Sequence, residues 1–514
     1  MDLAEWFLSP SERGNPATRL DSRHTPTSAW SHGNLVRPLV HGATYFAELA
    51  ERVNQTRRGD LLLFVDWRGD PDERLTGEAG SEVATIFAAA ARRGVDVRGL
   101  IWRSHWDRLA FSNTENRTLQ EGVNAAGGQC LLDMRVRTGG SHHQKFVVLR
   151  HPGRPENDVA FVGGIDLCHS RRDDAAHHGD PQRQSMAAAY GPRPAWHDVQ
   201  LCLTGPVVGD IETVFRERWE DPQRMSRSPL RRTADALRHD PERPTPLPPQ
   251  LPDPQPTGPH PVQVLRTYPR RLGGYPFAPQ GERSVARGCR KALRGARELI
   301  YVEDQYLWSV EVASAFADAL RRRPELRMVA VLPLRPDQDG RFSMPPNLAG
   351  RDTVIRTLRE AAPGRVAFYG IENAEGRPIY VHAKVSIVDD SWASVGSDNF
   401  NRRSWTHDSE ISAAVAHEDY ARGLRDELVR EHLGLEAAAP APARAEVFDA
   451  FADAAAALEQ WHRTGRRGPR PPGQLRPLVD PPLGRVTRAW AELLYRTVYD
   501  PDGRPLPLRV MRRL

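Results

Sequence analysis

The sequence predicts an α/β protein made of two similar halves, each with helices packed on a mixed β-sheet. Two observations lead to this prediction. Buried strands alternate with amphipathic helices in both halves, in the same order, on either side of a proline-rich stretch at residues 223–260. A His-x-Lys pattern also occurs twice, at residues 143–145 and 382–384, each time followed by an alternating apolar run.

The elements that precede the two His-x-Lys patterns match one by one. In the first half we expect a helix, a buried strand, a second helix and a second strand, at residues 45–59, 61–67, 82–94 and 95–102. In the second half the same order is expected at residues 283–298, 299–306, 310–324 and 326–334. Leu61 lies 82 residues before His143, and Ile300 lies 82 residues before His382, so we infer an internal duplication. A pseudo-twofold axis between the halves would then create one composite site where the two equivalent strands meet.

Two proline-rich stretches divide the chain further. The stretch PERPTPLPPQLPDPQPTGPHP favours extended chain without a core, and EAAAPAPARAE at 436–446 is a second break. We therefore expect a first lobe, a linker, a second lobe and a C-terminal extension, at residues 1–222, 223–260, 261–435 and 436–514. Within the extension we expect a helix at 446–463 and an extended end at 499–510, and we predict no chemistry for it.

Composition excludes several classes of protein. The net charge of +5, from 71 basic and 66 acidic residues, argues against a dedicated non-specific nucleic-acid binder. The four cysteines form no C-x-x-C pair, the N-terminus has no apolar signal segment, and 18 apolar residues never run together. We expect a cytoplasmic protein, peripheral at a membrane at most. The histidines lack metal-ligand spacing, so neither a metal nor another cofactor is expected.

Lysine is almost absent, and this makes the two patterns informative. Of the 71 basic residues only Lys145, Lys291 and Lys384 are lysines. Random placement would put lysine at both patterns roughly once in 800 cases. A compact ammonium enters a small pocket as a point charge, whereas a planar guanidinium needs more room. Lys145 and Lys384 are therefore predicted to contact a compact anion, and Lys291 is predicted to be a surface residue on a helix.

The second pattern has the groups that a phosphoryl site requires. His382 and Lys384 are two residues apart on a predicted strand and so share a face. Asp389 completes the spacing His-x-Lys-x4-Asp, and a turn with hydroxyl and amide donors follows at residues 396–399. An imidazole can attack or carry a proton, while the ammonium neutralises phosphate oxygens.

These paired motifs resemble those of the phospholipase D superfamily, whose members carry two H-x-K-x4-D-x6-G-S-x-N motifs. The similarity continues in FVGGIDLCHSRRDD, in WHDVQLCLTGPVVGDIETVFRERW, in LIYVEDQYL and in GSDNFNRRSWTHDSEI, and it spans about residues 40–433. The first and third of these stretches resemble the eukaryotic-type phospholipase D sequence. The resemblance implies a duplicated phospholipase D-like fold with one active site between the lobes.

The resemblance also implies roles for individual residues. His143 is the expected nucleophile and His382 the acid and base, although the reverse assignment stays open. Asp198 and Glu410 occupy the places of the carboxylates that hold the two histidines, and Asp389 is expected to be structural. The residues expected to bind the substrate phosphate, besides the two lysines, are Gly164, Asp166, Ser397 and Asn399. No metal is implied, because lysines and amide donors take its place.

One position departs from the family pattern. Arg150 stands where the first motif should have aspartate, and the insertion HPGRPEND follows. Either this end of the hairpin tolerates change, which we favour, or the half-site is damaged and activity is lost. Asp158, in the insertion, is a possible structural substitute.

The substrate is left open among phosphodiesters. We favour a phospholipid at a membrane surface, with water or a primary alcohol as acceptor, and expect no stable nucleic-acid partner. Aromatic residues expected near the site would suit a headgroup or a bilayer: Trp67, Trp106, Phe111, Tyr306, Trp308 and Trp405. The alternatives are a nuclease or other phosphodiesterase of the same superfamily, and an inactive lipid-binding module. Since one chain carries both motifs, a monomer is expected to suffice.

Overall fold

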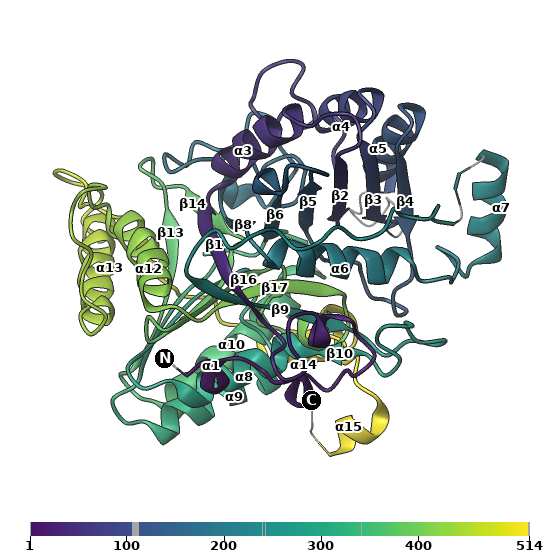
Figure 1. The fold of residues 1–514 in the computed structure, drawn as a ribbon. Coiled ribbons are helices and arrows are strands. Elements are labelled where there is room, and N and C mark those ends of the chain that lie inside the picture. Colours follow the sequence, from purple (N-terminus) through teal and green to yellow (C-terminus); the bar gives the residue numbers. More distant parts are fainter. Residues whose placement is uncertain (1, 105–112, 239, 242, 341, 512–514) are drawn as a thin grey trace.

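The computed structural model describes residues 2–104, 113–238, 240–241, 243–340 and 342–511 (Figure 1). Two mixed sheets face each other, and helices cover the outer face of each one. The first sheet has the strand order β4-β3-β2-β5-β6-β8-β1, in which β2, β3 and β4 are parallel and the other neighbours antiparallel. Its strands are β1 (Ser31–Val40), β2 (Leu61–Asp66), β3 (Asp96–Trp102), β4 (Gln129–Asp133), β5 (Phe146–Arg150), β6 (Val159–Gly163) and β8 (Val199–Thr204).

The second sheet repeats this arrangement. Its order is β13-β12-β11-β15-β16-β17-β9, and each neighbouring pair has the same sense as its counterpart in the first sheet. The strands are β9 (His260–Tyr268), β11 (Leu299–Asp304), β12 (Arg327–Val331), β13 (Val366–Glu372), β15 (Lys384–Val388), β16 (Trp392–Gly396) and β17 (Glu410–Val415). The shared topology confirms the predicted duplication.

Strand pairing corrects the spacing from which the duplication was inferred. Leu149 and Val388 each lie six residues after the motif histidine of their half. Leu149 pairs with Leu62, and Val388 pairs with Ile300. Leu62 rather than Leu61 is therefore the equivalent of Ile300, because the first half has one residue fewer between these two strands.

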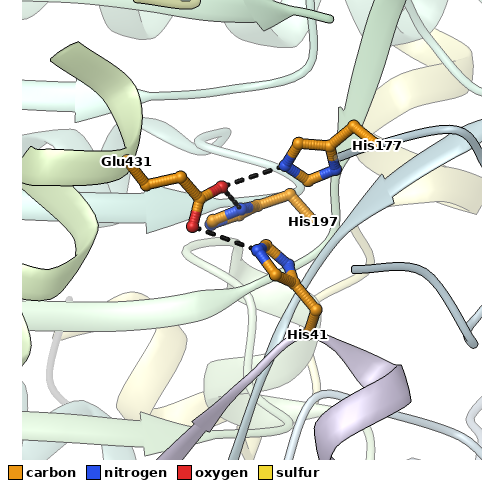
Figure 2. A group of neighbouring side chains, drawn as sticks. All are labelled: His41, His177, His197 and Glu431. Carbon is orange, nitrogen blue, oxygen red and sulfur yellow. Dashed lines mark hydrogen bonds and ion pairs between the residues drawn. The ribbon is translucent and has the colours of Figure 1, made fainter. Parts of the chain in front are cut away.

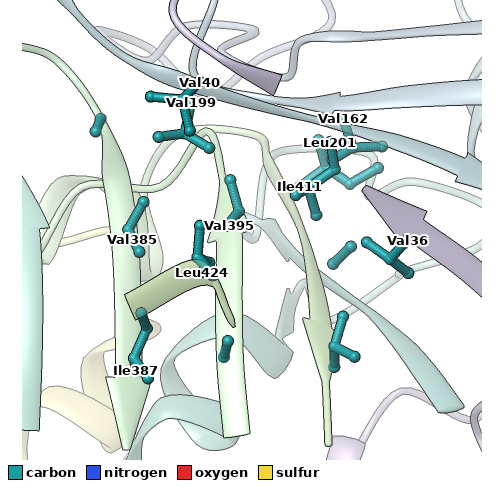
Figure 3. Packing of buried hydrophobic residues seen from close by; sticks show 14 of the residues in the cluster. Val36, Val40, Val162, Val199, Leu201, Val385, Ile387, Val395, Ile411 and Leu424 are labelled. Atoms are coloured by element: carbon teal, nitrogen blue, oxygen red, sulfur yellow. The ribbon is translucent and has the colours of Figure 1, made fainter. Parts of the chain in front are cut away.

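The main core lies between the two sheets (Figure 3). Apolar side chains of β6 and β8, such as Val162 and Leu201, meet those of β16 and β17, such as Val395 and Ile411. Helices α6 (Val207–Trp219) and α12 (Glu418–Leu433), which follow β8 and β17, add side chains to the same core. Each fully buried valine, leucine or isoleucine contributes about 1.5–3 kcal/mol, so this interface holds the lobes together.

Two smaller cores lie on the outer faces. On the first sheet they include helices α3 (Gly42–Asn54), α4 (Val83–Arg92) and α5 (Asn113–Ala125). On the second they include α8 (Ser284–Gly295), α9 (Val310–Arg322) and α10 (Met344–Ala361). Every position of β2, β5, β6, β11 and β15 is buried, which explains their continuous apolar runs.

The proline-rich segment lies against the first lobe, where its groups bond to that lobe. The amide of Thr245 donates to Gln129 Oε1 (2.8 Å), and Gln250 Nε2 donates to the carbonyl of Gly209 (2.9 Å). Helix α7 (Pro229–Arg238) lies within the predicted linker, so only the part after this helix is extended as expected. The boundaries of the linker and lobes stay predictions.

The C-terminal part contains the helix expected there, α13 (Val447–Arg463), and a short strand, β18 (Leu475–Pro477), which pairs antiparallel with β13. The expected extended end is partly wrong, because Leu506–Val510 form helix α15 with prolines in its first turn. The other short elements are α1 (Leu3–Trp6), α2 (Pro10–Arg13), β7 (Ala195–His197), β10 (Glu282–Arg283), β14 (Pro378–Val381), α11 (Arg402–Thr406) and α14 (Arg485–Leu494).

Candidate active site between the lobes

Strands β1 and β9 pair across the lobes, and two further short strand contacts between the lobes bring the His-x-Lys motifs together. Strand β14 pairs parallel with β7, so that Val381 lies opposite His197. In the same way His142 forms a parallel bridge with Ser409. The amide of His382 donates to the carbonyl of His197 (2.8 Å), and the amide of His143 donates to that of Ser409 (2.9 Å). Each motif histidine is thus held beside the residue that precedes a carboxylate of the other lobe.

Those carboxylates bind the histidines across the interface. His143 Nδ1 lies 2.9 Å from Glu410 Oε2, and His382 Nδ1 lies 2.6 Å from Asp198 Oδ2. Both carboxylates are fully buried. Because Nδ1 is engaged in each ring, Nε2 is the atom left for chemistry.

Burial and the two lysines disfavour positive charge on the rings. Burial, reinforced by Lys145 and Lys384, lowers the pKa of both His143 and His382 well below the usual range. Burial likewise raises the pKa of Glu410 to about 8 and raises that of Asp198. In each histidine–carboxylate pair, both shifts disfavour the imidazolium–carboxylate ion pair relative to the neutral forms.

Both motif lysines are buried beside the rings. Lys145 Nζ donates to the carbonyl of His143 (2.9 Å) and lies 3.3 Å from Asp166 Oδ1. Lys384 Nζ donates to the carbonyl of His382 and to Gln305 Oε1, the latter at 3.2 Å. Burial lowers the pKa of Lys384 to about 8. Lys291, in contrast, bonds to Glu12 Oε2 (2.6 Å) and the carbonyl of Phe7 (2.8 Å), so it anchors the N-terminal segment to helix α8.

The two turns after the motifs lie against the carboxylates. Ser397 Oγ donates to Glu410 Oε2 (2.6 Å), so its hydroxyl proton is committed to this carboxylate. Gly164 is the equivalent residue in the first half, and a Cβ there would collide with Asp198 Oδ1. Asn399 is buried with no partner on Oδ1 among the described residues. Burial alone would raise the pKa of Asp166, but Lys145 and Arg171 lower it, so Asp166 is ionised.

Arg150 ends strand β5 and Asp389 follows strand β15, in each case at the end of the strand away from the motif histidine. Arg150 is fully buried, and its guanidinium bonds to Asp158 (2.9 Å), Glu212 and the carbonyl of Pro252 (2.5 Å). The Asp389 carboxylate accepts from the amides of residues 297, 298 and 299, at 2.7–2.9 Å. Seven residues of extended chain place Arg150 about 20 Å from His143. Its contacts are structural, and Asp158 is its ion-pair partner rather than a substitute for the missing aspartate.

The aromatic residues that were expected near the site lie in different surroundings. Trp67 lies edge-on to His143, with ring centroids 6.0 Å apart, and Tyr306 packs on Trp308 at 4.2 Å. Trp405 belongs to an outer core. Trp106 and Phe111 lie outside the described residues.

Two further residues adjoin His382 and were missed from the sequence. The Trp196 ring lies 5.0 Å from the His382 ring, and the Arg171 guanidinium lies 4.0 Å above Trp196. Both stand in stretches that carry the family resemblance, which was the available signal. Arg171, which also lies 3.5 Å from Asp166 Oδ2, adds a third buried cation to Lys145 and Lys384.

A cavity of about 1490 Å³ opens beside the first motif. Gly139 and His407, which flank Ser141–His143 and Asp408–Glu410, line part of it, and Arg103, Arg227 and Arg271 are among its many arginines. Leu230 and Leu272 at its edge are 84% and 85% exposed. The cavity thus combines strong positive charge with apolar side chains.

Paired histidines and lysines at the junction of two duplicated α/β lobes define a class of phosphoryl-transfer proteins, and two family models identify it. Residues 76–243 match the family model described as phospholipase D, and residues 290–431 match the one described as cardiolipin synthase, PLD-like domain. The chain belongs to the phospholipase D superfamily.

Its relatives include phospholipase D1 of Schizosaccharomyces pombe, which is 26% identical over 58% of this chain and 27% of its own length. Phospholipase D alpha 1 of Arabidopsis thaliana is 26% identical over 60% of this chain and 51% of its own length. The chain thus spans about a quarter to a half of these curated relatives. In fold it is similar to phosphatidylserine synthase of Haemophilus influenzae, with a TM-score of 0.53 at 13% identity, covering 81% of this chain and 93% of that one. Among the described helices, none has both the length and the apolar character needed to cross a bilayer.

Proposed function

We propose that this protein is a phosphodiesterase that cleaves the headgroup ester of a phospholipid through a phosphohistidine intermediate. The observation that carries the proposal is the pair of imidazoles, each bound at Nδ1 by a carboxylate of the opposite lobe. Their Nε2 atoms stay available to one phosphorus atom, flanked by Lys145 and Lys384. This arrangement suits a double displacement.

In the first step, His143 Nε2 attacks phosphorus and the bond to the headgroup oxygen breaks. The His382–Asp198 pair supplies the proton that this leaving oxygen needs, which the raised pKa of Asp198 helps the pair to retain. In the second step, the pair takes a proton from water, the oxygen attacks phosphorus, and the phosphorus–nitrogen bond breaks. A primary alcohol in place of water gives a phosphatidyl alcohol. The ammonium groups balance the charge on the non-bridging oxygens throughout.

His143 is proposed as the nucleophile by its place in the first motif. Its side chain is 15% exposed, against 5% for His382, so it is the more accessible ring. The second histidine, held by the shorter contact to its carboxylate, is then the acid and base.

A phospholipid is favoured among phosphodiesters on two grounds. The relatives reported above are named phospholipases D. The cavity beside the site also joins arginines to exposed leucines, a combination suited to an anionic membrane surface.

The test uses the full chain with phosphatidylcholine vesicles and a small primary alcohol, and measures choline and phosphatidyl alcohol. We expect the wild type and the control His32→Ala, changed at an exposed histidine, to form both products. His143→Ala and His382→Ala should form neither. Mass spectrometry of rapidly denatured protein should find a phosphatidyl adduct on the peptide with His143. An adduct on the peptide with His382 reverses the assignment.

Other outcomes separate the parts of the proposal. If the wild type cleaves no choline, ethanolamine or glycerol phospholipid but does cleave single-stranded DNA, the lipid substrate is wrong and the two-histidine site stands. If either histidine variant keeps full activity, the double displacement is wrong. If lipid binds and no phosphodiester is cleaved, the protein is a binding module.

A further inference from the structure

A second group of histidines lies within the molecule, on the lobe interface (Figure 2). His41 follows β1, His177 lies in the loop between β6 and β7, and His197 ends β7, so all three come from the first lobe. Glu431 projects from α12 of the second lobe into the space between them. The three histidines are 3%, 1% and 0% exposed. We propose that these four side chains form a structural binding site for a divalent transition-metal ion, best suited to zinc, that joins the two lobes.

The donor atoms already converge. His41 Nε2 lies 3.0 Å from Glu431 Oε2, while His177 Nε2 and His197 Nδ1 lie 2.9 and 3.4 Å from Oε1. One donor atom from each residue fits within a common distance of 4.8 Å. Zinc bonds of about 2.0–2.2 Å to nitrogen and oxygen place neighbouring ligand atoms of a tetrahedron about 3.3 Å apart. Small side-chain movements would therefore complete a three-histidine, one-carboxylate site.

A carboxylate outside this group orients the His197 ring as in known metal sites, and another lies near the His177 ring. His197 Nε2 lies 2.6 Å from Glu303 Oε2, which leaves Nδ1 directed at Glu431. His177 Nδ1 lies 3.6 Å from Asp173 Oδ2, which leaves Nε2 directed there too. A metal-bound histidine usually donates its other nitrogen to such a carboxylate, because this fixes the tautomer and strengthens the ligand.

Backbone strain also points to this group. His41 has a φ of 68° and His177 a φ of 52°, in the left-handed region that β-carbon sterics disfavour. Such conformations persist where surrounding interactions hold them, and they are enriched at functional sites. Two of the three proposed histidine ligands are held in this way.

Charge balance favours a cation here. Glu431, Glu303 and Asp173 are three buried or nearly buried carboxylates whose ion-pair partners among the described residues are all histidines. The Tyr301 hydroxyl also donates to Glu303, and the amides of Trp196 and Gly179 donate to Asp173, but none of these groups carries a charge. A dication would balance the carboxylates with neutral imidazoles, the form that binds metals.

The four ligands are distant in sequence, at positions 41, 177, 197 and 431. No metal was expected from the sequence because no two histidines have the close spacing that is typical of metal ligands. A site whose ligands come from four distant segments leaves no such spacing in the sequence. His197 also accepts the amide of His382 and precedes Asp198, so the ion would hold both partners of one catalytic pair in place.

The test uses the full chain, produced with a tag that contains no histidine in zinc-supplemented medium. Zinc per chain is measured by inductively coupled plasma mass spectrometry. The wild type and the control His178→Gln, changed at the exposed neighbour of His177, should each hold about one zinc. His177→Gln and Glu431→Gln should lose it, and Glu303→Gln should bind zinc about 10–100-fold more weakly.

A second measurement removes the dependence on how the variants fold. Chelator-stripped wild type is titrated with cobalt(II), whose visible absorption reports tetrahedral nitrogen and oxygen ligands, and with zinc while the thermal midpoint is followed. We expect one cobalt site with intense absorption and a higher midpoint with zinc. Wild type that holds no stoichiometric zinc, or that shows neither cobalt absorption nor a zinc-dependent midpoint, overturns the proposal. Unchanged zinc in folded His177→Gln overturns it too. Neither readout requires phosphodiesterase activity.

Discussion

Replacing Arg150 by aspartate would restore the residue type of the second motif, and we expect it to harm the protein. In the fold Arg150 is the shared partner of Asp158 and Glu212, with no exposed surface. An aspartate there would place a third carboxylate beside two that are already buried. Arg150→Met, which removes the cation while keeping apolar bulk, should be the milder change.

The magnitude follows from the burial of these charges. Removing one partner of a buried ion pair costs about 3–5 kcal/mol when the other partner is left unpaired. Glu212 keeps Arg216 (2.7 Å) and Asp158 keeps the amide of His151 (2.6 Å), so Arg150→Met should lie at or below the lower end, whereas the added carboxylate of Arg150→Asp reaches the middle of this range. The entropy of unfolding is about 2.1 cal/mol/K per residue, so a first lobe of about 200 residues unfolds with about 0.4 kcal/mol/K. A loss of about 4 kcal/mol then lowers the melting temperature by about 10 °C, or by about 4 °C if the whole chain unfolds as one unit.

The assay is scanning calorimetry of the wild type, Arg150→Met, Arg150→Asp and a control, Arg463→Met. Arg463 forms an exposed pair with Glu459, with its side chain 72% exposed, so its loss should change stability by less than about 0.5 kcal/mol. Phosphodiester cleavage at 20 °C, per folded molecule, should be unchanged in Arg150→Met. A melting temperature of Arg150→Asp equal to that of the control would refute the structural role, as would a gain in activity.

Two further predictions concern the site. Replacing either carboxylate by its amide, in Asp198→Asn or Glu410→Gln, should lower kcat about 10²–10⁴-fold, because the amide no longer holds the ring in the required tautomer; kinetics showing less than about a fivefold loss would contradict this. The pH profile of kcat/KM should be bell-shaped with its maximum near pH 8. The rate rises as the His143–Glu410 pair, in which burial raises the pKa of Glu410 to about 8, loses its extra proton. It falls as Lys384, with a pKa lowered by burial to about 8, loses its charge. Lys384→Arg keeps a cation that does not titrate but needs more room, so it should lower kcat/KM at every pH and leave an alkaline limb set by the His382–Asp198 pair alone. An alkaline limb with an unchanged midpoint would show that Lys384 does not contribute to it.

The fold was predictable from local patterns, since apolar runs and their order repeat in both halves. The residue-by-residue equivalence of the two halves was not predictable. Counting along the chain matched Ile300 of β11 with Leu61, whereas strand pairing matches it with the next residue of β2. The distinction between Lys145 and Lys384 on one hand and Lys291 on the other came from the rarity of lysine combined with the repeated His-x-Lys pattern, which Lys291 lacks. Their surroundings differ accordingly, since only the first two lie beside the motif histidines.

Contacts across the lobe interface could not be predicted from the sequence. Asp198 and Glu410 could be named as partners of the histidines, yet their exchange between lobes depends on the β7–β14 pairing and on the bridge from residue 142 to residue 409. Ser397 was expected on the phosphate, but which acceptor its hydroxyl meets is decided by the position of Glu410. Trp405 was expected near the site because it is adjacent in sequence to the motif turn, and its side chain instead packs into an outer core.

The exchange of carboxylates between lobes bears on how such a protein can arise and diverge. A gene for one half would encode one histidine and one carboxylate that is placed to bind the histidine of another copy, so only two associated copies could function. Fusing the copies keeps that mutual dependence and removes the need for them to stay alike. The two halves are then free to differ, as Gly164 does from Ser397 and Asp166 from Asn399. Two identical copies could not give their histidines separate tasks by sequence, and a fused pair can.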